Sequence, residues 1–580
     1  MQMMKSNKLL SAIEWIVIAI ISVALSFLFT LSSFDKAYTY NASGADADLL
    51  SLNYEVNDAS FDMGTGNYSV VPGGDSYLLY TAVNSAYKGV YLSLKEPALY
   101  DTVLKVYWTG AGDEALSEKL SKSCVITAGS NSGFVTLSNY DLNLVRVNIS
   151  NDCVIDKLVL TKSKAATSYS FGDDSLLFLI IRFVLIYLVL ILAYMSFKER
   201  ALLSSGEYCV KANKTGTISA VKSIFIDTPK NPAARKYEYD YIRTLAAVLV
   251  ITMHSICDIF VPQVTRGDAG YGTLKFVLAV SLGCNVLYVM LSGSLILQPK
   301  DESIKDFYTK RMVKVIIPTL CYFGLYMLLG YPKEVFGNGI WEGLKSCGKD
   351  LLSGRPAYMP HVWLVYTILG LYILAPFLRI MLSHIKDSWL FGLLVAGFII
   401  NCLTMYLPLA GLTFGIETPI ASWVGIFLLG YYMTTDHAKK FYNVFIVLGI
   451  AGFIASFLMI YYNPNLLYYT CNWTPNMWLV GCGIFAFFSK FKGIFGKRNI
   501  VIGALSKYNF SIMLIHILLL MKVVLPIGWR LEYEYGHLSL FIVGIIIVCF
   551  VLSYVLAVIF DNTAVAAVMY LYNKCVKKKV

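Results

Sequence analysis

Long apolar segments recur along most of this chain, and no other feature restricts its possible folds as strongly. Each segment is close to the ~20 residues that a helix needs to cross a lipid bilayer. The 580 residues are 57% hydrophobic and only 15% charged, which is more apolar surface than the cores of a water-soluble protein could bury. The sequence therefore predicts a polytopic α-helical membrane protein with about 12 transmembrane helices.

The first predicted span is an N-terminal anchor within residues 1–33. Lys5 and Lys8 precede an apolar stretch over residues 13–31. A cleaved signal peptide is the competing interpretation, but its apolar region would be only about 7–15 residues long and would end at small residues. The segment 28–31, Leu-Phe-Thr-Leu, offers no such site. We therefore expect an uncleaved anchor.

Residues 34–174 have a different character. Short runs of alternating β-branched and aromatic residues lie between clusters of Gly, Asn, Asp and Ser, for example at 77–80, 89–94, 102–108 and 144–149. This pattern predicts an antiparallel β-sandwich inserted between two spans. Because both flanks are basic, the positive-inside rule places the sandwich outside the cell. Cys124 and Cys153 are its only cysteines, and either a disulfide or a reduced pair is compatible with that location.

The remaining chain is predicted to cross the membrane eleven more times. A second span at 175–196 leads into a basic cytosolic linker at 197–236, a ten-helix membrane domain at 237–562 and a basic cytosolic tail at 563–580. The ten spans are expected near 241–260, 275–297, 313–331, 362–383, 388–407, 419–434, 441–461, 475–489, 503–525 and 538–560. Both termini are then cytosolic, in what we expect to be a bacterial plasma membrane. Among the outer loops, only 332–360 is long enough to form a partial lid or an interfacial helix.

Charge and cysteine usage narrow the possible partners. The net charge of +11 comes from short basic clusters between apolar spans, which is a topology signal rather than a nucleic-acid-binding patch. The twelve cysteines include no C-x-x-C pair, so we predict no metal site. Membrane lipids are expected as surroundings, and the sequence leaves the oligomeric state open.

Ionisable groups inside spans are costly and are therefore the first functional candidates. Arg243 lies at the cytosolic end of the first span of the membrane domain, and His254 follows eleven residues later. At 1.5 Å per residue this is roughly 16 Å along the helix, about half the hydrocarbon thickness. A neutral imidazole at that depth suits removal of a hydroxyl proton, and Asp258, one turn further on, could orient it. A buried polar contact between helices is the structural alternative.

Several short motifs in the membrane domain, taken in order, resemble the membrane-bound acyltransferase family 3. They are the Arg243-x10-His254 spacing, Leu291-Ser292-Gly293, the run from Phe307 to Pro318, the segment His361-Val-Trp363-Leu-Val-Tyr366, and the run from Ser506 to His516. The resemblance covers residues 236–560. One motif departs from it, because many members carry Glu-Glu-Gln shortly after the Trp, whereas this chain has Tyr366 to Tyr372 without a carboxylate. That variant is similar to a branch with uncharacterised acetyltransferases and the membrane half of vancomycin-resistance serine racemases.

The resemblance implies a site for acyl-CoA that opens to the cytosol. It makes His254 the catalytic histidine, and Arg243 with the basic pair Arg311 and Lys314 the groups that bind the donor, acetyl-CoA as co-substrate. Basic residues at the inner edge of a span are also ordinary topology anchors, so this second interpretation of Arg311 and Lys314 stays open. The further candidates are His361, His516, Trp363, Tyr366 and Ser292. We expect Trp363 and Tyr366 to be packing residues and Ser292 to serve close helix packing rather than nucleophilic attack.

The expected function is therefore transfer of an acetyl group from cytosolic acetyl-CoA to a hydroxyl of an extracellular or cell-wall glycan. The β-sandwich would hold the glycan, since Tyr and Trp side chains stack on sugars, although a sandwich core needs aromatic residues as well. A transporter or exporter of a glycan or small polar metabolite is the alternative, because many spans with few buried charges also describe a permease. A surface sensor ranks last, because no cytosolic output module is visible.

Overall fold

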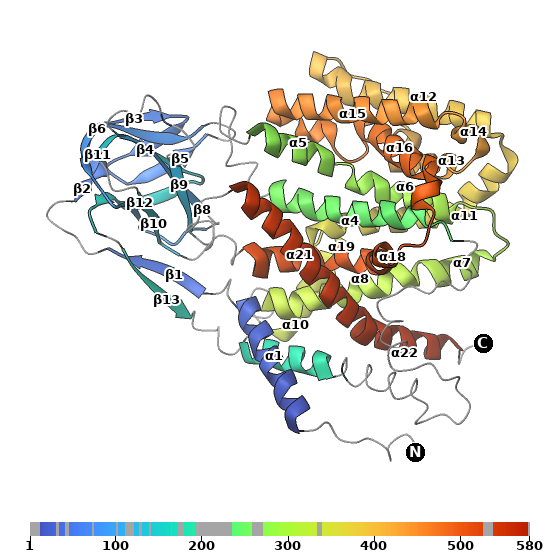
Figure 1. Cartoon of the computed structure of the whole chain (residues 1–580), viewed down its shortest axis with the longest axis horizontal. Coiled ribbons are helices and arrows are strands. Elements are labelled where there is room, and N and C mark those ends of the chain that lie inside the picture. Colours follow the sequence, from blue (N-terminus) through green and yellow to red (C-terminus); the bar gives the residue numbers. More distant parts are fainter. Residues whose placement is uncertain are drawn as a thin grey trace.

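The structure is a computed structural model of the whole chain. It describes residues 12–30, 34–40, 46–71, 75–99, 102–110, 116, 121–126, 130–137, 141–163, 165–171, 179–191, 194, 235–257, 271–332, 339–525 and 538–577. A β-rich N-terminal region lies to one side of a larger helical region (Figure 1). The predicted linker at 197–236 lies almost entirely outside the described residues.

The β-rich region contains thirteen strands among the described residues. They are β1 (Phe34–Thr39), β2 (Ala47–Asp48), β3 (Tyr54–Asn57), β4 (Ala59–Asp62), β5 (Asn67–Val70), β6 (Tyr77–Ala86), β7 (Gly89–Leu94), β8 (Thr102–Gly110), β9 (Ser121–Ile126), β10 (Ser132–Thr136), β11 (Asp141–Ile149), β12 (Cys153–Thr161) and β13 (Ala166–Phe171). One sheet has the order β10-β7-β12-β5-β4 with β2 also paired to β12, and the other has the order β3-β6-β11-β8-β9. Every described strand pair is antiparallel.

The two sheets contribute to one apolar core. Leu92 and Leu158 from the first sheet and Tyr80, Val106 and Val145 from the second are almost fully buried in the same cluster. Because successive strand side chains point to opposite faces, the alternation seen in the sequence gives each sheet one buried face. A β-rich region at this position is therefore what the sequence predicted.

The two cysteines of the β-rich region are both free thiols. Cys124 is buried on β9, and Cys153 lies on β12 of the other sheet. Burial raises the pKa of the Cys153 thiol to about 12, so this thiol stays protonated and weakly reactive at neutral pH. Of the two alternatives that the sequence left open, the structure has the reduced pair.

A two-stranded ribbon joins the β-rich region to the N-terminal helices. β1 and β13 pair from Phe34 opposite Phe171 to Thr39 opposite Ala166, and Figure 1 shows this ribbon between the two sheets and α1 (Ala12–Thr30). The helix at Leu179–Ile191 packs beside α1, with the rings of Trp15 and Tyr187 6.1 Å apart. The two ends of the β-rich region thus lead into neighbouring helices.

The helical region is built from many helices and three π-helical turns. Its longer helices are α4 (Glu238–Cys257), α5 (Tyr271–Ser281), α6 (Cys284–Ile296), α7 (Ile304–Arg311), α8 (Val313–Leu325), α10 (Ile340–Leu352), α11 (Trp363–His384), α12 (Asp387–Tyr406), α13 (Trp423–Tyr432), α15 (Tyr442–Tyr462), α16 (Pro475–Lys490), α18 (Ile500–Lys507), α19 (Asn509–Leu519), α21 (Leu538–Phe560) and α22 (Ala566–Lys577). The π-helical turns are η5 (Tyr326–Gly330), η10 (Leu520–Val524) and η11 (Asp561–Val565), and η6 (Pro360–Val362) is a short 3-10 turn.

Six helical segments of the described chain are long and apolar enough to cross a membrane. They are Tyr271–Ile296, Ile304–Gly330, Pro360–His384, Asp387–Ala410, Tyr442–Tyr462 and Ile542–Asn573, and α18 with α19 forms a seventh, bent by 67°, if that pair is one span. The count of about twelve stays a prediction. Five predicted spans are not among these seven: α1, the 179–191 helix and α13 are shorter in the described residues, α16 has 16 residues, and α4 is the fifth.

The predicted C-terminal tail and one predicted loop both contain helices. The chain does not become an extended tail after residue 562, because η11 and α22 continue the last helix to Lys577. In the outer loop 332–360, α10 exposes Trp341 (83%) and Leu352 (89%), as an interfacial helix does. The Tyr366 hydroxyl donates a hydrogen bond of 2.5 Å to the Leu351 carbonyl and so attaches α10 to α11.

The segment formed by α5 and α6 lies at the centre of the helical region. In its apolar stretch 83% of the residues are buried, against 22–33% in the other five spans. α4 contacts both of these helices as well as α16, α19 and α21, and Ile242, Ala247 and Ile251 on it are fully buried. The inner face of α4, the helix of Arg243 and His254, therefore faces other helices rather than lipid.

An apolar cavity of about 310 Å³ separates the N-terminal helix pair from the core. α1, the 179–191 helix, α8, α19 and α21 all contribute to its wall, and α8 contributes Gly324. Beside it, the buried Arg182 donates from Nε to the Leu329 carbonyl (2.9 Å). The lining side chains are almost all apolar, so the cavity offers few hydrogen-bonding groups to a polar substrate. The site of the chemistry therefore has to be sought elsewhere.

Candidate functional site

Three histidines from distant parts of the chain meet inside the helical region. His254 lies on α4, His361 in η6 at the start of the α11 span, and His516 on α19. The ring centroid of His516 is 5.3 Å from that of His254 and 5.1 Å from that of His361, and the third pair is 6.4 Å apart. His361 is 7% exposed and His516 is fully buried. We call these three residues the histidine cluster.

Hydrogen bonds to backbone carbonyls fix two of the imidazoles. His361 Nε2 lies 3.1 Å from the Leu514 carbonyl oxygen, and His516 Nδ1 lies 2.7 Å from that of Met513. Because a carbonyl only accepts, both of these nitrogens must carry the hydrogen. His361 Nδ1 and His516 Nε2 are then lone-pair acceptors, and neither has a hydrogen-bond partner among the described residues. Two buried proton acceptors are thus left available beside His254.

Local sequence explains how two of these histidines reach the cluster. Pro360 occupies the first turn of η6, where its missing N–H costs no helical hydrogen bond, and His361 follows it. α18 and α19 meet at a bend of 67°, after which α19 runs alongside α4. His516 lies in the last turn of α19 and reaches His254 on the neighbouring helix.

A buried tyrosine makes two hydrogen bonds to the backbone of α19 beside the cluster. The Tyr326 hydroxyl donates to the Leu514 carbonyl (3.0 Å) and accepts from the Leu518 N–H (2.9 Å). In an uninterrupted helix Leu518 N–H would bond Leu514 directly. The sequence did not single out Tyr326, because a tyrosine within an apolar span gives no signal of this role.

A half-buried carboxylate links α8 and α19 near this contact. Asp561, the first residue of η11, accepts hydrogen bonds from Tyr322 (3.0 Å) and Ser511 (2.6 Å). Buried acids in membrane helices are rare and mark functional or structural contacts. Sequence reasoning missed Asp561 because it directly follows the apolar run that was expected to end at residue 560.

The N-terminal end of α4 carries an ion-pair network. Asp240 accepts from Arg235 (3.0 Å), from Arg243 (2.8 Å) and from the Ser506 hydroxyl (2.8 Å). The Asp240 side chain is only 3% exposed, whereas that of Arg243 is 28% exposed. Two guanidinium groups on one carboxylate leave a net positive charge. The spacing of Asp240 and Arg243, three residues apart on one helix, could have predicted this pair.

The two residues of the predicted basic pair, Arg311 and Lys314, lie in different surroundings in the structure. Arg311 is half-buried at the end of α7, and its Nε is buried without a hydrogen-bond partner in the described chain. Lys314 is exposed on α8. The hydroxyl of the half-buried Tyr372 interacts with Ser292 and lies within electrostatic range of both Arg311 and Arg243. The structure thus brings Arg243 and Arg311 into one electrostatic environment and leaves Lys314 on the surface.

The other sequence candidates lie outside the histidine cluster. Trp363 packs on Trp423 with ring centroids 5.8 Å apart, and Tyr366 contacts α10 as described above. Ser292 precedes Gly293, at which a Cβ atom would overlap the Phe427 carbonyl. α6 and α13 therefore cross in backbone contact. Asp258 lies outside the described residues, and within the described residues no group of His, Cys, Asp or Glu has the arrangement of a metal site.

The arrangement is suited to moving a proton. Each neutral imidazole has one nitrogen that can accept a proton, and the histidine cluster collects three of them inside the protein. At the opposite end of α4, the guanidinium groups of Arg243 and Arg311 provide positive charge for an anionic group. One helix thus connects an anion-binding end with a proton-accepting interior.

Comparison with known proteins agrees with this geometry. The model of the acyltransferase domain family matches residues 236–558, which is more than half of the 580 residues and includes all three histidines. No curated protein matches the chain. Since this match covers more than half of the chain, the chain belongs to acyltransferase family 3 and is a membrane acyltransferase.

Proposed function

We propose that the protein is a membrane O-acyltransferase that moves an acetyl group from cytosolic acetyl-CoA to a hydroxyl of an extracellular or cell-wall glycan. The observation that carries this proposal is the histidine cluster, with two buried lone-pair nitrogens beside His254. Acyl transfer to a hydroxyl needs a positioned base more than any other group. The proposal includes a bacterial plasma membrane with both termini in the cytosol and residues 34–174 outside.

The donor would bind at the cytosolic end of α4. The phosphates of coenzyme A are anionic, and guanidinium groups bind phosphate through paired N–H donors. Asp240 holds Arg243 in place while leaving over a quarter of its side chain exposed, and the unpaired Nε of Arg311 is a further donor. The thioester would then reach toward the histidine cluster along α4. Lys314, exposed on the surface, would contribute only long-range attraction.

The proposed reaction needs no cofactor besides the donor. His254 takes the proton from the acceptor hydroxyl while that oxygen attacks the acetyl carbonyl carbon. The carbon–sulfur bond of the thioester breaks, and the departing thiolate takes the proton from His254, so protons balance over the cycle. His516, whose Nε2 can only accept, stabilises the positive charge that His254 carries in between.

The β-rich region would bind the acceptor outside the membrane. On the outer face of the sheet β3-β6-β11-β8-β9, the Arg146 guanidinium lies 3.9 Å from the ring centroid of Tyr77 and 5.0 Å from that of Tyr107. Arg146 also pairs with Asp75 and donates to the Asn148 side chain. Aromatic rings flanked by charged and amide groups bind sugars by stacking and hydrogen bonding. A β-sandwich in this role would hold the glycan close to the membrane domain.

A transporter remains a weaker candidate. Six or seven candidate spans are compatible with a permease, but membership of an acyltransferase family points to transfer chemistry. No specific feature of the described residues favours a transport path over the acyltransferase site, so we propose only the transferase.

Acetylation of the envelope tests the proposal directly. Permeabilised cells that carry the full-length protein would receive radiolabelled acetyl-CoA, and base-labile label would be counted in the cell-wall fraction. We expect His254→Ala to remove this label while the variant still reaches the membrane. His384→Ala is the matched control, because His384 is exposed at the end of α11. Wild-type labelling by His254→Ala would overturn the catalytic assignment, and labelled palmitoyl-CoA in a parallel arm would identify a longer acyl donor.

A further inference from the structure

We propose that Tyr326 is a positioning residue of the transferase site, which acts by opening one hydrogen bond of α19 and so fixing His361 and His516. This inference rests on the proposed function and extends it to a residue outside the histidine cluster. Tyr326 is fully buried, and its ring centroid is 5.9 Å from that of His361. Its hydroxyl already donates once and accepts once, so we assign it no contact with substrate.

The first step concerns the backbone of α19. The Tyr326 hydroxyl is inserted between the Leu514 carbonyl and the Leu518 N–H, which would otherwise bond each other. Insertion of a side-chain group into the helical ladder is a recognised cause of local helix distortion. η10 begins at Leu520, immediately after the insertion, and π-helical turns of this kind are frequent at functional sites. His516 lies within the opened turn, so the insertion sets the direction of its ring.

The second step concerns the carbonyl that the insertion releases. The Leu514 oxygen accepts from both the Tyr326 hydroxyl and His361 Nε2. A carbonyl oxygen has two lone pairs, so it can hold both donors. Because Nε2 is held as the donor, Nδ1 of His361 is the lone-pair nitrogen. Tyr326 and His361 thus share one acceptor, so Tyr326 positions the carbonyl that holds His361 Nε2.

A second contact between the same helices makes the effect of Tyr326 local. One turn earlier on α8, Tyr322 donates to Asp561, which also accepts from Ser511 on α19. α8 therefore attaches to its neighbours at two successive turns. Loss of the Tyr326 hydroxyl leaves the Tyr322 contact in place, so we expect the helices to stay packed while the turn of α19 around His516 closes.

The first experiment compares Tyr326→Phe with Tyr442→Phe in the labelling assay. Tyr442 is buried on α15 and donates to the Met433 carbonyl, so its variant loses the same kind of bond away from the histidines. We expect Tyr326→Phe to lower kcat about 10- to 100-fold, as losses of groups that orient reactive side chains do. KM for acetyl-CoA should not change, because Arg243 and Arg311 lie at the other end of α4. A raised KM with unchanged kcat would overturn the proposal.

A double-mutant comparison tests whether Tyr326 acts through the histidines. In a His361→Ala background, Tyr326→Phe should lower the remaining rate by less than about twofold, since coupled residues are not additive. An equal loss in both backgrounds would overturn the proposal. Failure of the proposed function is distinguishable, because in that case wild-type protein and His254→Ala would label the cell wall equally.

Magnetic resonance of isotope-labelled histidine gives a readout independent of turnover. The full-length protein in lipid vesicles should show His361 with its hydrogen on Nε2, assigned by difference from His361→Ala. In Tyr326→Phe we expect this signal to change to a mixture of the two neutral forms, whereas Tyr442→Phe should leave it unchanged. An unaltered His361 signal in Tyr326→Phe would overturn the proposal even if activity were lost.

Discussion

His516 offers the most direct test of the histidine chemistry at the scale of one residue. Its Nδ1–H bonds the Met513 carbonyl, whereas its Nε2 faces the cluster without a partner in the described chain. An asparagine amide can replace the first group but not the second. We therefore expect His516→Asn to keep the melting temperature of the wild type and to lower the labelling rate about 100-fold, in the range of lost acid–base assistance. Thermal unfolding in detergent and the acetyl-labelling assay would measure both quantities.

A full rate in the folded His516→Asn variant would contradict the role given to Nε2. His516→Gln is the complementary substitution, because its longer amide reaches toward the Nε2 position and loses the bond to Met513. We expect this variant to be both less stable and slow.

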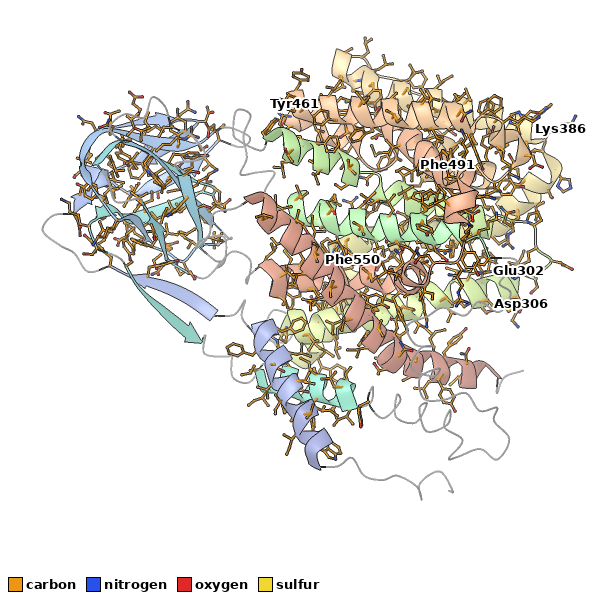
Figure 2. The ribbon with its side chains drawn as sticks, viewed as in Figure 1. Glu302, Asp306, Lys386, Tyr461, Phe491 and Phe550 are labelled. Atoms are coloured by element: carbon orange, nitrogen blue, oxygen red, sulfur yellow. The ribbon has the colours of Figure 1, made fainter. Side chains whose placement is uncertain are left out.

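Arg243 should affect binding of the donor more than the chemical step. A lysine at this position keeps the charge but cannot bind Asp240 and a phosphate with the planar fork of a guanidinium. We expect Arg243→Lys to raise KM for acetyl-CoA about tenfold, which corresponds to ~1.4 kcal/mol, with kcat changed less than twofold. Lys386→Ala is the control, since Lys386 is exposed in the turn between α11 and α12 (Figure 2). A fall in kcat alone would place Arg243 in the chemistry instead.

Some site residues could be found from sequence because their signal is local. Arg243 and His254 share one helix, so their separation follows from helical rise. His361 and His516 were candidates as polar residues in apolar spans, but their meeting with His254 depends on how three helices pack. Tyr326 and Asp561 could not be predicted, since their roles arise from backbone atoms of α19 and from the continuation of the last helix.

At the scale of elements, the crossing of α6 and α13 depends on two glycines. A Cβ added at Gly293 would overlap the Phe427 carbonyl, and one at Gly430 would overlap that of Met290. We expect Gly293→Ala to destabilise the protein by about 1–3 kcal/mol, the usual cost of overpacking. The control is Gly324→Ala on α8, where a Cβ meets no atom within 4 Å and helix propensity improves by about 1 kcal/mol. Equal melting temperatures for the two variants would contradict the close crossing.

The segment between α6 and α7 is attached to α11 by Glu302. Its carboxylate pairs with Arg379 (2.9 Å) and Lys300 (3.2 Å). Burial disfavours the charged form, but hydrogen bonds from both cations outweigh burial and hold the pKa of this carboxyl below its ordinary value. The pair therefore stabilises the fold at pH values above the unfolded-state pKa of about 4.3, and this stabilisation is lost as the pH falls through the lower folded-state pKa.

Glu302→Gln should accordingly lower the melting temperature at pH 7 and converge with the wild type in acid. Asp306, which Figure 2 labels close to Glu302, is the control. Its carboxylate is 55% exposed and only 3.6 Å from Lys310, and such surface pairs contribute about 0–1 kcal/mol. Asp306→Asn should therefore melt like the wild type at both pH values. A wild-type melting temperature for Glu302→Gln at pH 7 would contradict the role of the pair.

Elements were predictable where one periodic signal dominated. The apolar runs predicted the long spans, and the amphipathic outer loop contains α10. The π-helical turns and the bend between α18 and α19 were not predictable, because no local pattern of composition marks them. The number of spans could not be predicted for a similar reason, since α13 has only ten residues and depends on its neighbours.

On the scale of the whole molecule, the ribbon of β1 and β13 separates the β-rich region from the helices (Figure 1). Thr39 and Ala166 lie opposite each other at the end of the ribbon that leads into the β-rich region. Residues 40–165 are therefore an insertion between two paired strands. The alternating pattern of residues 34–174 allowed the β-rich region to be predicted, but not this pairing, which joins positions 127 residues apart. The ribbon allows the insertion to be removed without stretching the membrane anchors.

Replacement of residues 40–165 by Asn-Gly, which favours a two-residue hairpin turn, therefore tests the role of the β-rich region. Binding of labelled acetyl-CoA and thermal unfolding of the membrane domain should persist, because the donor groups lie on α4 and α7. Transfer to the cell wall should fall at least about tenfold, since a tethered binding domain raises the local concentration of acceptor. Tyr77→Ala in the intact chain should reduce transfer in the same direction by removing a ring beside Arg146. If the shortened protein acetylates the wall normally, the β-rich region does not hold the acceptor, and if it loses acetyl-CoA binding as well, that region is structural.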